Sequence, residues 1–426
     1  MTKQITQVPI CDGVTFHNIG EQRFKTGRLT AAMLLPLSAE TASANAILPY
    51  LLRRSCREYP TFRKLNEKLS SLYGASLQAE VYKLGEAQVL AVSAAGLDDR
   101  YTLDKESVSG QLAELLCSIL FQPAFENGRF RQEDIGQEKR QLIEQIDSEF
   151  NEKRIYAKNR CEELMCGGEA FGVGRFGAKE QVEALTGEEI YAAWRRALSQ
   201  ARIELMMVGG SDPQKAIDGF QKAFAKINRE EILPCNTKVV PKADRVREFH
   251  DVMDVAQAKL VMGFRSGIAV PGDDVMAMRV MCALLGGTPH SKLFLNVREK
   301  LSLCYYCSSS YDRNKGIMLI QSGVEQKNIG KAREEILRQL QAVKDGDFTD
   351  EDLDATKMSV ANSFRTMSDY LGGLEFWYLS QAFDKNTLTP EQSAEEANKV
   401  TKEQVVKAAQ TVTLDTVYQL TGKEEA

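Results

Sequence analysis

The sequence predicts an α+β protein of two tandem, duplicated α/β-roll domains, each a mostly antiparallel sheet packed with helices. Three local patterns recur in the same order in the two halves of the 426 residues. Strand-like and helix-like segments are interleaved, and neighbouring strands share short turns, which favours antiparallel pairs over a doubly wound parallel sheet. A polar, proline-bearing stretch lies between the halves. We therefore expect a domain over 1–212, a linker over 213–242 and a second domain over 243–426.

The recurring patterns are short, but their common order in the two halves supports a duplication. The first pattern is EKLSSLY at 67–73, which recurs as EKLSLCY at 299–305. The second is FRQEDI at 130–135, which recurs as FTDEDL at 348–353. The third is TGEEI at 186–190, which recurs as TKEQV at 401–405. Coincidence among helix-start signals is the alternative, because the second and third patterns both look like the first turn of a helix. The spacing of more than 200 residues is far longer than a solenoid repeat, so each copy should be a whole domain.

The first half predicts a definite order of elements. Apolar residues alternate over 29–35, as in a strand, and Leu65 and Leu69 share one face of an amphipathic helix. Two strand-like runs meet at a turn at Gly85. The expected strands are 28–37, 75–83, 87–95 and 202–208, and the expected helices are 44–54, 62–72, 104–121, 131–166, 187–198 and 212–228. The first strand after the linker is expected to start at about Ala258.

Charge and composition exclude several classes of function. The chain carries 54 Lys and Arg against 59 Asp and Glu, so its net charge of −5 gives no global attraction to nucleic acid or anionic lipid. No apolar run approaches the ~20 residues that a membrane helix needs. The polar N-terminus lacks the apolar region of a signal peptide, and nine cysteines without framework spacing suggest reduced thiols. We therefore expect a cytoplasmic protein without nucleic-acid or membrane partners.

Two stretches near residue 290 resemble a known family. Residues 285–294 and 297–305 read LGGTPHSKLF and VREKLSLCY. They are similar to the Gly-Gly-x-x-x-Ser-x-Leu-Phe and Arg-Glu-Lys…Tyr stretches of the insulysin, pitrilysin and mitochondrial-processing-peptidase family. Phe171-Gly172 with Gly177, ahead of 186–189, resembles another stretch of that family. The resemblance covers nearly the whole chain and implies two insulysin-like half-shells.

The metal site of that family is missing from this sequence. Its members are inverzincins, which bind zinc through His-x-x-Glu-His on a helix and a downstream glutamate. The three histidines here are His17, His250 and His290, and the corresponding helix, 45–54, contains no His, Glu or Asp. Glu144 could correspond to the downstream ligand, but one carboxylate does not hold zinc. We expect no catalytic residue, metal or cofactor in this chain, and no zinc peptidase activity from it alone.

What remains of the family's chemistry lies in the second half. In the family's heterodimers, one subunit supplies zinc and the other supplies an Arg and a Tyr, seven residues apart, which contact substrate. Arg298 and Tyr305 have this spacing. An Arg can form two hydrogen bonds to a peptide carbonyl or carboxylate, and a Tyr hydroxyl can donate to an oxyanion. The alternative is that Arg298 pairs with a neighbour such as Glu299 and that Tyr305 is a half-buried strand residue.

Two further pairs lie close to these residues in the sequence. For Gly286 and Gly287 the resemblance suggests a loop that borders the substrate chamber, and a helix cap is the alternative. Cys304 and Cys307 form a C-x-x-C. On a strand, residues three apart point to opposite faces, which is poor geometry for one metal, so we expect a structural role for these cysteines.

These observations leave two classes of function. The first is a non-catalytic subunit of a heterodimeric zinc metallopeptidase, which closes the chamber and presents Arg298 and Tyr305, bordered by Gly286 and Gly287, to a peptide held by a zinc-bearing paralogue. The second is a peptidase-derived scaffold or binding protein with no role in proteolysis, which would not need the Arg298/Tyr305 pair. An enzyme of unrelated chemistry is not supported, because the sequence has no Ser/His/Asp grouping, P-loop or dinucleotide fingerprint.

Overall fold

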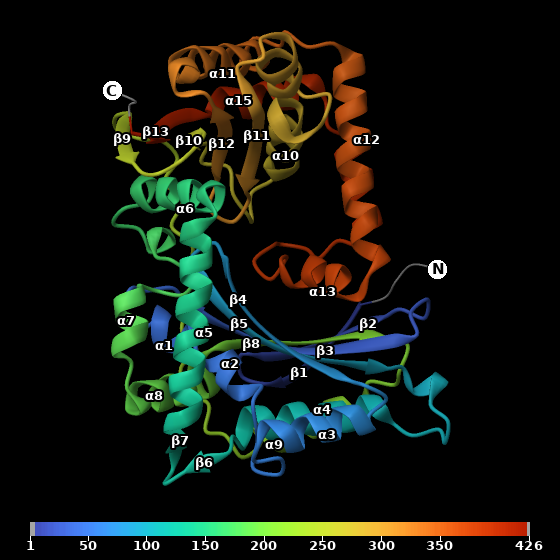
Figure 1. Cartoon of the computed structure of the whole chain (residues 1–426). Helices are drawn as coiled ribbons and strands as arrows, with labels where there is room; N and C mark the ends of the chain where they lie inside the picture. Colours follow the sequence, from blue (N-terminus) through green and yellow to red (C-terminus); the bar gives the residue numbers. More distant parts are fainter. Residues whose placement is uncertain (1–4, 424–426) are drawn as a thin grey trace. The chain divides into compact units, whose positions relative to one another are not determined.

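The computed structural model describes residues 5–423 and contains two compact units, each built around one large sheet (Figure 1). The first unit comprises Met1–Ile146, Val173–Asn236 and Asp369–Ser380, and the second comprises Asp147–Gly172, Thr237–Ser368 and Gln381–Ala426. Antiparallel pairs dominate both sheets, and helices pack on them. The predicted α+β class, with a sheet in each half, is confirmed.

The first sheet has six strands in the order β1-β2-β8-β3-β5-β4. They are β1 (Ile5–Cys11), β2 (Val14–Gly20), β3 (Thr26–Pro36), β4 (Ser76–Leu84), β5 (Ala87–Leu97) and β8 (Arg202–Gly209). β2 and β8 run parallel, and the other neighbours are antiparallel. The four strands expected in the first half are confirmed as β3, β4, β5 and β8. Gly85 makes the β4–β5 turn with a positive φ of 58°, a conformation that glycine adopts freely.

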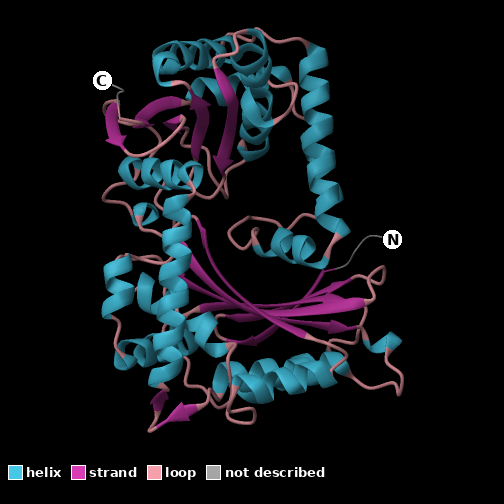
Figure 2. Cartoon of the chain, viewed as in Figure 1, coloured by secondary structure: helices cyan, strands magenta, loops and turns pink. Residues whose placement is uncertain are grey.

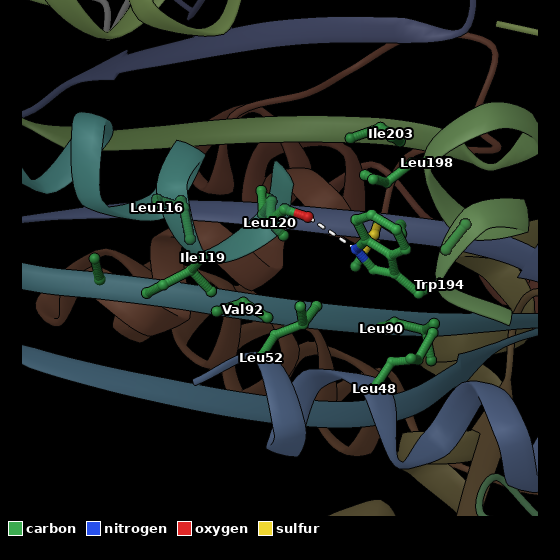
Figure 3. Packing of buried hydrophobic residues seen from close by; sticks show 14 of the residues in the cluster. Leu48, Leu52, Leu90, Val92, Leu116, Ile119, Leu120, Trp194, Leu198 and Ile203 are labelled. Atoms are coloured by element: carbon green, nitrogen blue, oxygen red, sulfur yellow. Dashed lines mark hydrogen bonds between the residues drawn. The ribbon is translucent and has the colours of Figure 1, made fainter. Parts of the chain in front are cut away.

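Helices cover both faces of this sheet (Figures 1 and 2). Helices α4 (Val108–Phe121) and α9 (Gln214–Phe224) pack along one face, and α13 (Leu371–Leu379) lies on the other. The remaining elements of this unit include α3 (Phe62–Ser71), β6 (Phe125–Glu126), β7 (Arg129–Phe130), α7 (Lys179–Ala184) and α8 (Gly187–Gln200). Trp194 of α8 lies in the core, and its indole Nε1 donates to the carbonyl oxygen of Leu120 at 2.9 Å (Figure 3). The buried indole N–H is thereby satisfied.

Two predicted helices are each divided in the structure. The expected helix 44–54 consists of α1 (Ala42–Ala46) and α2 (Leu48–Leu52), and Pro49 lies in the first turn of α2, where a helix tolerates proline. The expected helix 131–166 consists of α5 (Gln132–Asn151) and α6 (Lys153–Met165). Glu152 interrupts it, because its backbone is non-helical and its side chain accepts a hydrogen bond from the Arg154 N–H. Helical periodicity on both sides of this cap makes the two helices read as one.

The second sheet has five strands in the order β11-β12-β10-β13-β9. They are β9 (Arg247–Val252), β10 (Ala258–Arg265), β11 (Cys304–Asp312), β12 (Ile317–Val324) and β13 (Thr413–Thr421). Its helical elements include α10 (Val275–Cys282), η3 (Ala283–Gly287), η4 (Leu293–Lys300), α11 (Ile329–Lys344), α12 (Asp350–Thr366), α14 (Pro390–Asn398) and α15 (Lys402–Thr411). β9 and β13 are parallel, and the other neighbours are antiparallel. The strand expected at about Ala258 is β10.

The two sheets have the same strand order once the extra edge strand β1 is set aside. The order β2-β8-β3-β5-β4 corresponds to β9-β13-β10-β12-β11, and the single parallel pair falls at the same place in each. The recurring sequence patterns also fall at corresponding elements. Residues 130–135 and 348–353 lead into α5 and α12, and Thr186 and Thr401 are the N-caps of α8 and α15, each in a capping box.

The units are not contiguous in sequence. Helix α6 comes from the first half of the chain, yet it packs on β10 and β13, where Ala157 and Cys161 are buried. Helix α13 comes from the second half and packs on β3 and β8. The stretch 213–242 contains α9, whose Phe220 and Phe224 belong to the core of the first unit. Each compact unit therefore combines separate stretches of the chain, unlike the continuous domains that end at 212 and begin at 243. Within residues 5–423, no helix is both long enough and apolar enough to cross a bilayer.

Candidate functional site

Arg298 and Tyr305 line one hollow of the second unit. Arg298 is on η4, and Tyr305 is the second residue of β11. The hollow has a volume of about 420 Å³, and its other lining residues are Glu299, Ser302, Leu303, Cys304 and Glu325. The structure thus brings together the two side chains that the sequence paired only by their spacing.

The turn between η4 and β11 sets the positions of both side chains. The last turns of η4 are wide: the Leu301 N–H donates to the carbonyl of Asn296 at 3.2 Å, and the Leu303 N–H donates to that of Val297 at 3.1 Å. Ser302 then adopts a left-handed conformation with φ of 48°, which is uncommon for a residue other than glycine. The chain reverses at this point and enters β11 beside the helix that it has just left.

A β-bulge at the start of β11 exposes Tyr305. Cys304 is paired with Val324 and Tyr306 with Gly323, so Tyr305 is an extra residue without a partner on β12. Such a bulge redirects the side chains around it. Tyr305 is 67% exposed, which leaves its hydroxyl open to the hollow. The alternative of a half-buried strand residue does not describe its environment.

Arg298 is held by weak contacts at the rim of the same hollow. Its guanidinium carbon lies 4.6 Å from the centroid of the Phe294 ring, and its Nε lies 3.6 Å from Oε1 of Glu299. The side chain is 41% exposed, and an exposed ion pair of this kind contributes only about 0–1 kcal/mol. The contact with Glu299 that the sequence suggested is present, but it is long and leaves most donors of the guanidinium available.

Gly286 and Gly287 lie on η3, outside the residues that line the hollow. Gly286 is buried, and a Cβ added there would lie 2.7 Å from Cδ1 of Leu293 and 2.7 Å from the backbone N of Ser309. Close packing of η3 against β11 therefore requires glycine at this position. Gly287 is exposed, and its nearest neighbour to an added Cβ is that of Ala283 at 3.4 Å. The two glycines consequently have different roles in the fold.

In the segment 45–54, which the resemblance matches to the zinc helix, Asn45 takes part in buried hydrogen bonds. Asn45 of α1 donates from Nδ2 to Oε1 of Gln88 at 3.0 Å, and its Oδ1 accepts from Arg196 at 2.9 Å. Burial lowers the pKa of the Arg196 guanidinium. Glu144 is on the exposed side of α5. In the described part of the chain, no group of three or more His, Cys, Asp or Glu side chains could hold a metal ion.

The three histidines lie on separate elements. His17 of β2 hydrogen-bonds to Glu204 of β8, and His250 of β9 hydrogen-bonds to the Thr421 hydroxyl at 2.7 Å. His290 is exposed in the loop after η3. Burial alone would raise the pKa of the Glu204 carboxyl, but the hydrogen bond to His17 and the charge of Arg202 lower it.

The expectation that Cys304 and Cys307 point to opposite faces is wrong. Because of the bulge, Cys304 is opposite Val324 and Cys307 is opposite Ser322, two positions on one face of β12. Each of the two thiols shifts the pKa of the other. Gly323 is the sequence signal that could have revealed this, since glycine inside a strand often marks a bulge. A Cβ there would lie 2.5 Å from Cε1 of Tyr306.

The fold and the site together define a class: a metallopeptidase-like protein of two related sheets that lacks the zinc-binding motif. Residues 184–360 match the family model described as "Peptidase M16 inactive domain". The sequence is 33% identical over 418 residues to the "Probable inactive metalloprotease YmfF" of Bacillus subtilis (strain 168), and the match covers 97% of each chain. This chain belongs to the M16 peptidase family and is an inactive homologue within it, which confirms the resemblance found in the sequence.

Solved structures give the same fold. A conserved protein from Enterococcus faecalis V583 superimposes with a TM-score of 0.89 at 27% identity and covers 99% of both chains. The peptidase M16 inactive domain from Pseudomonas fluorescens superimposes with a TM-score of 0.77 at 15% identity, covering 99% of this chain and 98% of that one. The second likeness is one of fold alone.

Proposed function

We propose that this chain is the non-catalytic subunit of a heterodimeric zinc metallopeptidase. In this proposal it closes the substrate chamber and presents Arg298 and Tyr305 to a peptide held by a zinc-bearing paralogue. The observation that carries the proposal is the shared hollow, in which both side chains keep free donors although the chain has no zinc motif. Gly287, exposed on η3, borders the substrate in this proposal, and Gly286 fixes that segment against β11.

The chemistry of peptide hydrolysis explains the division between two subunits. The reaction needs a metal-bound water, a general base and donors to the developing oxyanion in one enclosed cavity. The zinc-bearing paralogue supplies the metal and the glutamate base of His-x-x-Glu-His. This chain supplies a guanidinium for a substrate carbonyl or carboxylate and a phenolic hydroxyl for the oxyanion.

Two finer points belong to the same proposal. Gene duplication as the origin of the two halves is supported by the equal strand order of the sheets and by the matching positions of the recurring patterns. A cytoplasmic location is supported by the free thiols at all nine cysteines of the chain.

Co-purification tests the proposal. The chain is tagged in the cells that produce it and isolated under mild conditions; co-eluting proteins are identified by mass spectrometry, and zinc is measured in the eluate. The expected result is one M16 paralogue with an intact His-x-x-Glu-His and about one zinc per pair of chains. Elution alone, or with a large complex that lacks such a paralogue, contradicts the proposal and favours a peptidase-derived scaffold.

A further inference from the structure

We propose that Cys304 and Cys307 form a thiol–disulfide exchange site that reacts with small-molecule disulfides entering the hollow beside Arg298. Cys304 is the attacking thiol, and Cys307 is the resolving thiol. The exchange needs no peptidase partner, so it stands independently of the proposed function.

The bulge in β11 places the two cysteines on one face of the strand, near enough in register to form a disulfide. Their partners Val324 and Ser322 are two residues apart on β12, and two residues of a strand span about 6.6 Å. Disulfides join Cα atoms that are roughly 4.4–6.8 Å apart. Both thiols lie on one face and each shifts the pKa of the other, so a local rearrangement of the bulge would join the sulfurs. A regular strand would have separated the same C-x-x-C onto two faces.

The hollow determines which sulfur reacts first. Both cysteines are buried, with Cys304 8% and Cys307 5% exposed, but only Cys304 lines the hollow together with Arg298. A small disulfide that enters the hollow therefore meets Cys304 first. Cys307 lies behind it, in position to attack a mixed disulfide formed on Cys304.

The surroundings of Cys304 favour its thiolate. Interactions with the Cys307 thiol, the Ser322 hydroxyl and the charge of Arg298 outweigh the opposing effect of burial and lower the pKa of Cys304 to about 7. The same contact and burial raise the pKa of Cys307. Burial raises the pKa of the other seven thiols, which are Cys11, Cys56, Cys117, Cys161, Cys166, Cys235 and Cys282. Cys304 therefore lines a hollow and is about half thiolate at pH 7, whereas burial keeps the other seven thiols protonated.

The exchange is balanced without any further reagent. The Cys304 thiolate attacks one sulfur of a disulfide R–S–S–R, forms a Cys304–S–S–R bond and expels R–S⁻, which takes a proton. Cys307 loses its proton, attacks the Cys304 sulfur and expels the second R–S⁻. Two protein thiols are thereby oxidised to one disulfide, and the small disulfide is reduced to two thiols. An excess of small thiol reverses both steps.

Glutathione disulfide serves as the probe with the full-length reduced chain. Products are trapped with N-ethylmaleimide and mapped by mass spectrometry. The wild type is expected to form a Cys304–Cys307 disulfide, Cys307→Ser to accumulate glutathione on Cys304, and Cys304→Ser to carry none at Cys307. Circular dichroism of the two variants verifies that they are folded. A wild type in which Cys304 stays unmodified, or in which glutathione remains on Cys304 without forming the internal disulfide, overturns the proposal.

The rate of alkylation gives a second readout that a merely structural thiol would not show. With iodoacetamide, modification of Cys304 should be half-maximal near pH 7, and at pH 7 it should be about tenfold faster than that of any other cysteine in the folded chain. Arg298→Gln should move the midpoint to higher pH, whereas Arg63→Gln, a change on exposed α3, should leave it unchanged. Coinciding profiles for all nine cysteines contradict the assignment.

Discussion

Among single residues, the proposed function depends on two side chains that reach one hollow from different elements. Arg298 comes from the last turns of η4 and Tyr305 from the bulge of β11. Neither is fixed by strong contacts within the chain, since Arg298 has a long contact to Glu299 and Tyr305 is mostly exposed. This exposure leaves both side chains available for the substrate contact that the proposed function requires.

Substitution of these two residues should change activity in the two-subunit peptidase without changing stability. Tyr305→Phe removes a donor to the oxyanion and should lower kcat by about 10²–10³, with little effect on KM. Arg298→Ala removes charge-assisted hydrogen bonds of about 1.5–3 kcal/mol and should raise KM by roughly 10- to 100-fold. Steady-state cleavage of a peptide by the mixed subunits measures both effects.

Matched controls for this pair are Tyr101→Phe and Arg63→Ala, which remove the same groups from other exposed positions of the chain. Both should leave kcat and KM unchanged. Equal kinetics for Tyr305→Phe and the wild type would remove the tyrosine from the proposed site.

The family resemblance together with the residue spacing suggests the pair Arg298 and Tyr305, but spacing does not describe Cys304 and Cys307. The seven-residue spacing of the first pair is a property of one segment. The common face of the cysteines depends on how β11 pairs with β12, and the bulge arises where Gly323 lets Tyr306 approach the backbone. A rule for regular strands could not foresee this arrangement.

At the element scale, η3 packs so closely on β11 that the two adjacent glycines should respond differently to alanine. In Gly286→Ala the new Cβ would lie 2.7 Å from the backbone N of Ser309, so we expect a loss of about 1–3 kcal/mol in the free energy of unfolding. Gly287→Ala adds an ordinary contact at 3.4 Å and should change the stability by no more than about 0.5 kcal/mol. Urea denaturation of the two variants makes the comparison, and equal losses would contradict the packing role of Gly286.

The strength of the local pattern decided which elements could be predicted. Alternation of apolar residues and apolar runs predicted the strands β3, β5 and β8, which are largely buried on both faces. Amphipathic pattern and helix-start signals predicted the capped helices α3 and α8. Strands β1 and β2 were not predicted, and of the strands in the second half only β10 was. β1 and β9 are short edge strands with half-exposed residues, so burial imposes little pattern on them.

At the scale of the whole molecule, a buried charge network joins distant segments within the second unit. Arg265 of β10 donates to Asp415 of β13 at 2.8 Å and to Glu169, which follows α6, at 2.6 Å. The ammonium of Lys315 lies 2.7 Å from the Glu169 carboxylate. These four residues come from segments that are widely separated in sequence, so the network stabilises the assembly of the unit rather than any one element.

Removing one carboxylate of this network should destabilise the second unit at neutral pH. Burial would raise the pKa of Asp415, but hydrogen bonds from Arg247, Arg265 and Thr416 lower it below its usual value. Asp415→Asn removes one of the two carboxylates that neutralise the buried Arg265 guanidinium, and we expect a loss of about 3–5 kcal/mol in the free energy of unfolding at pH 7. Asp354→Asn, on the exposed side of α12, is the control and should cost less than about 0.5 kcal/mol.

The direction of the Asp415 pKa shift determines how the loss in free energy of unfolding depends on pH. The Asp415 carboxylate has a lower pKa in the folded chain than in the unfolded one, so its stabilising effect is complete above the unfolded value of about 3.9 and disappears as the pH falls through the folded value. The difference in the free energy of unfolding between the wild type and Asp415→Asn should therefore decrease below about pH 4. Urea denaturation at several pH values, monitored by hydrogen exchange in β10 and β13, measures it. A difference that stays constant to pH 3 would contradict the assigned shift.

Sequence reasoning predicted two sheet-bearing halves but not which segments build each unit. The amphipathic face of a helix shows that it will be buried, but it does not identify the sheet that buries it. Helix α6 therefore read as part of the first half, although Ala157 and Cys161 are buried against the second sheet. The same reason kept α13 from being placed with β3 and β8.

Peptide cleavage by separately purified subunits is the most direct test of the central claim. This chain is mixed in increasing amounts with the zinc-bearing paralogue, and the cleavage rate of a fluorogenic peptide is recorded. The account predicts negligible cleavage by either chain alone and a rate that rises to a plateau at one chain of each kind. Full activity of the paralogue without this chain, unchanged when this chain is added, would contradict the proposed heterodimeric peptidase.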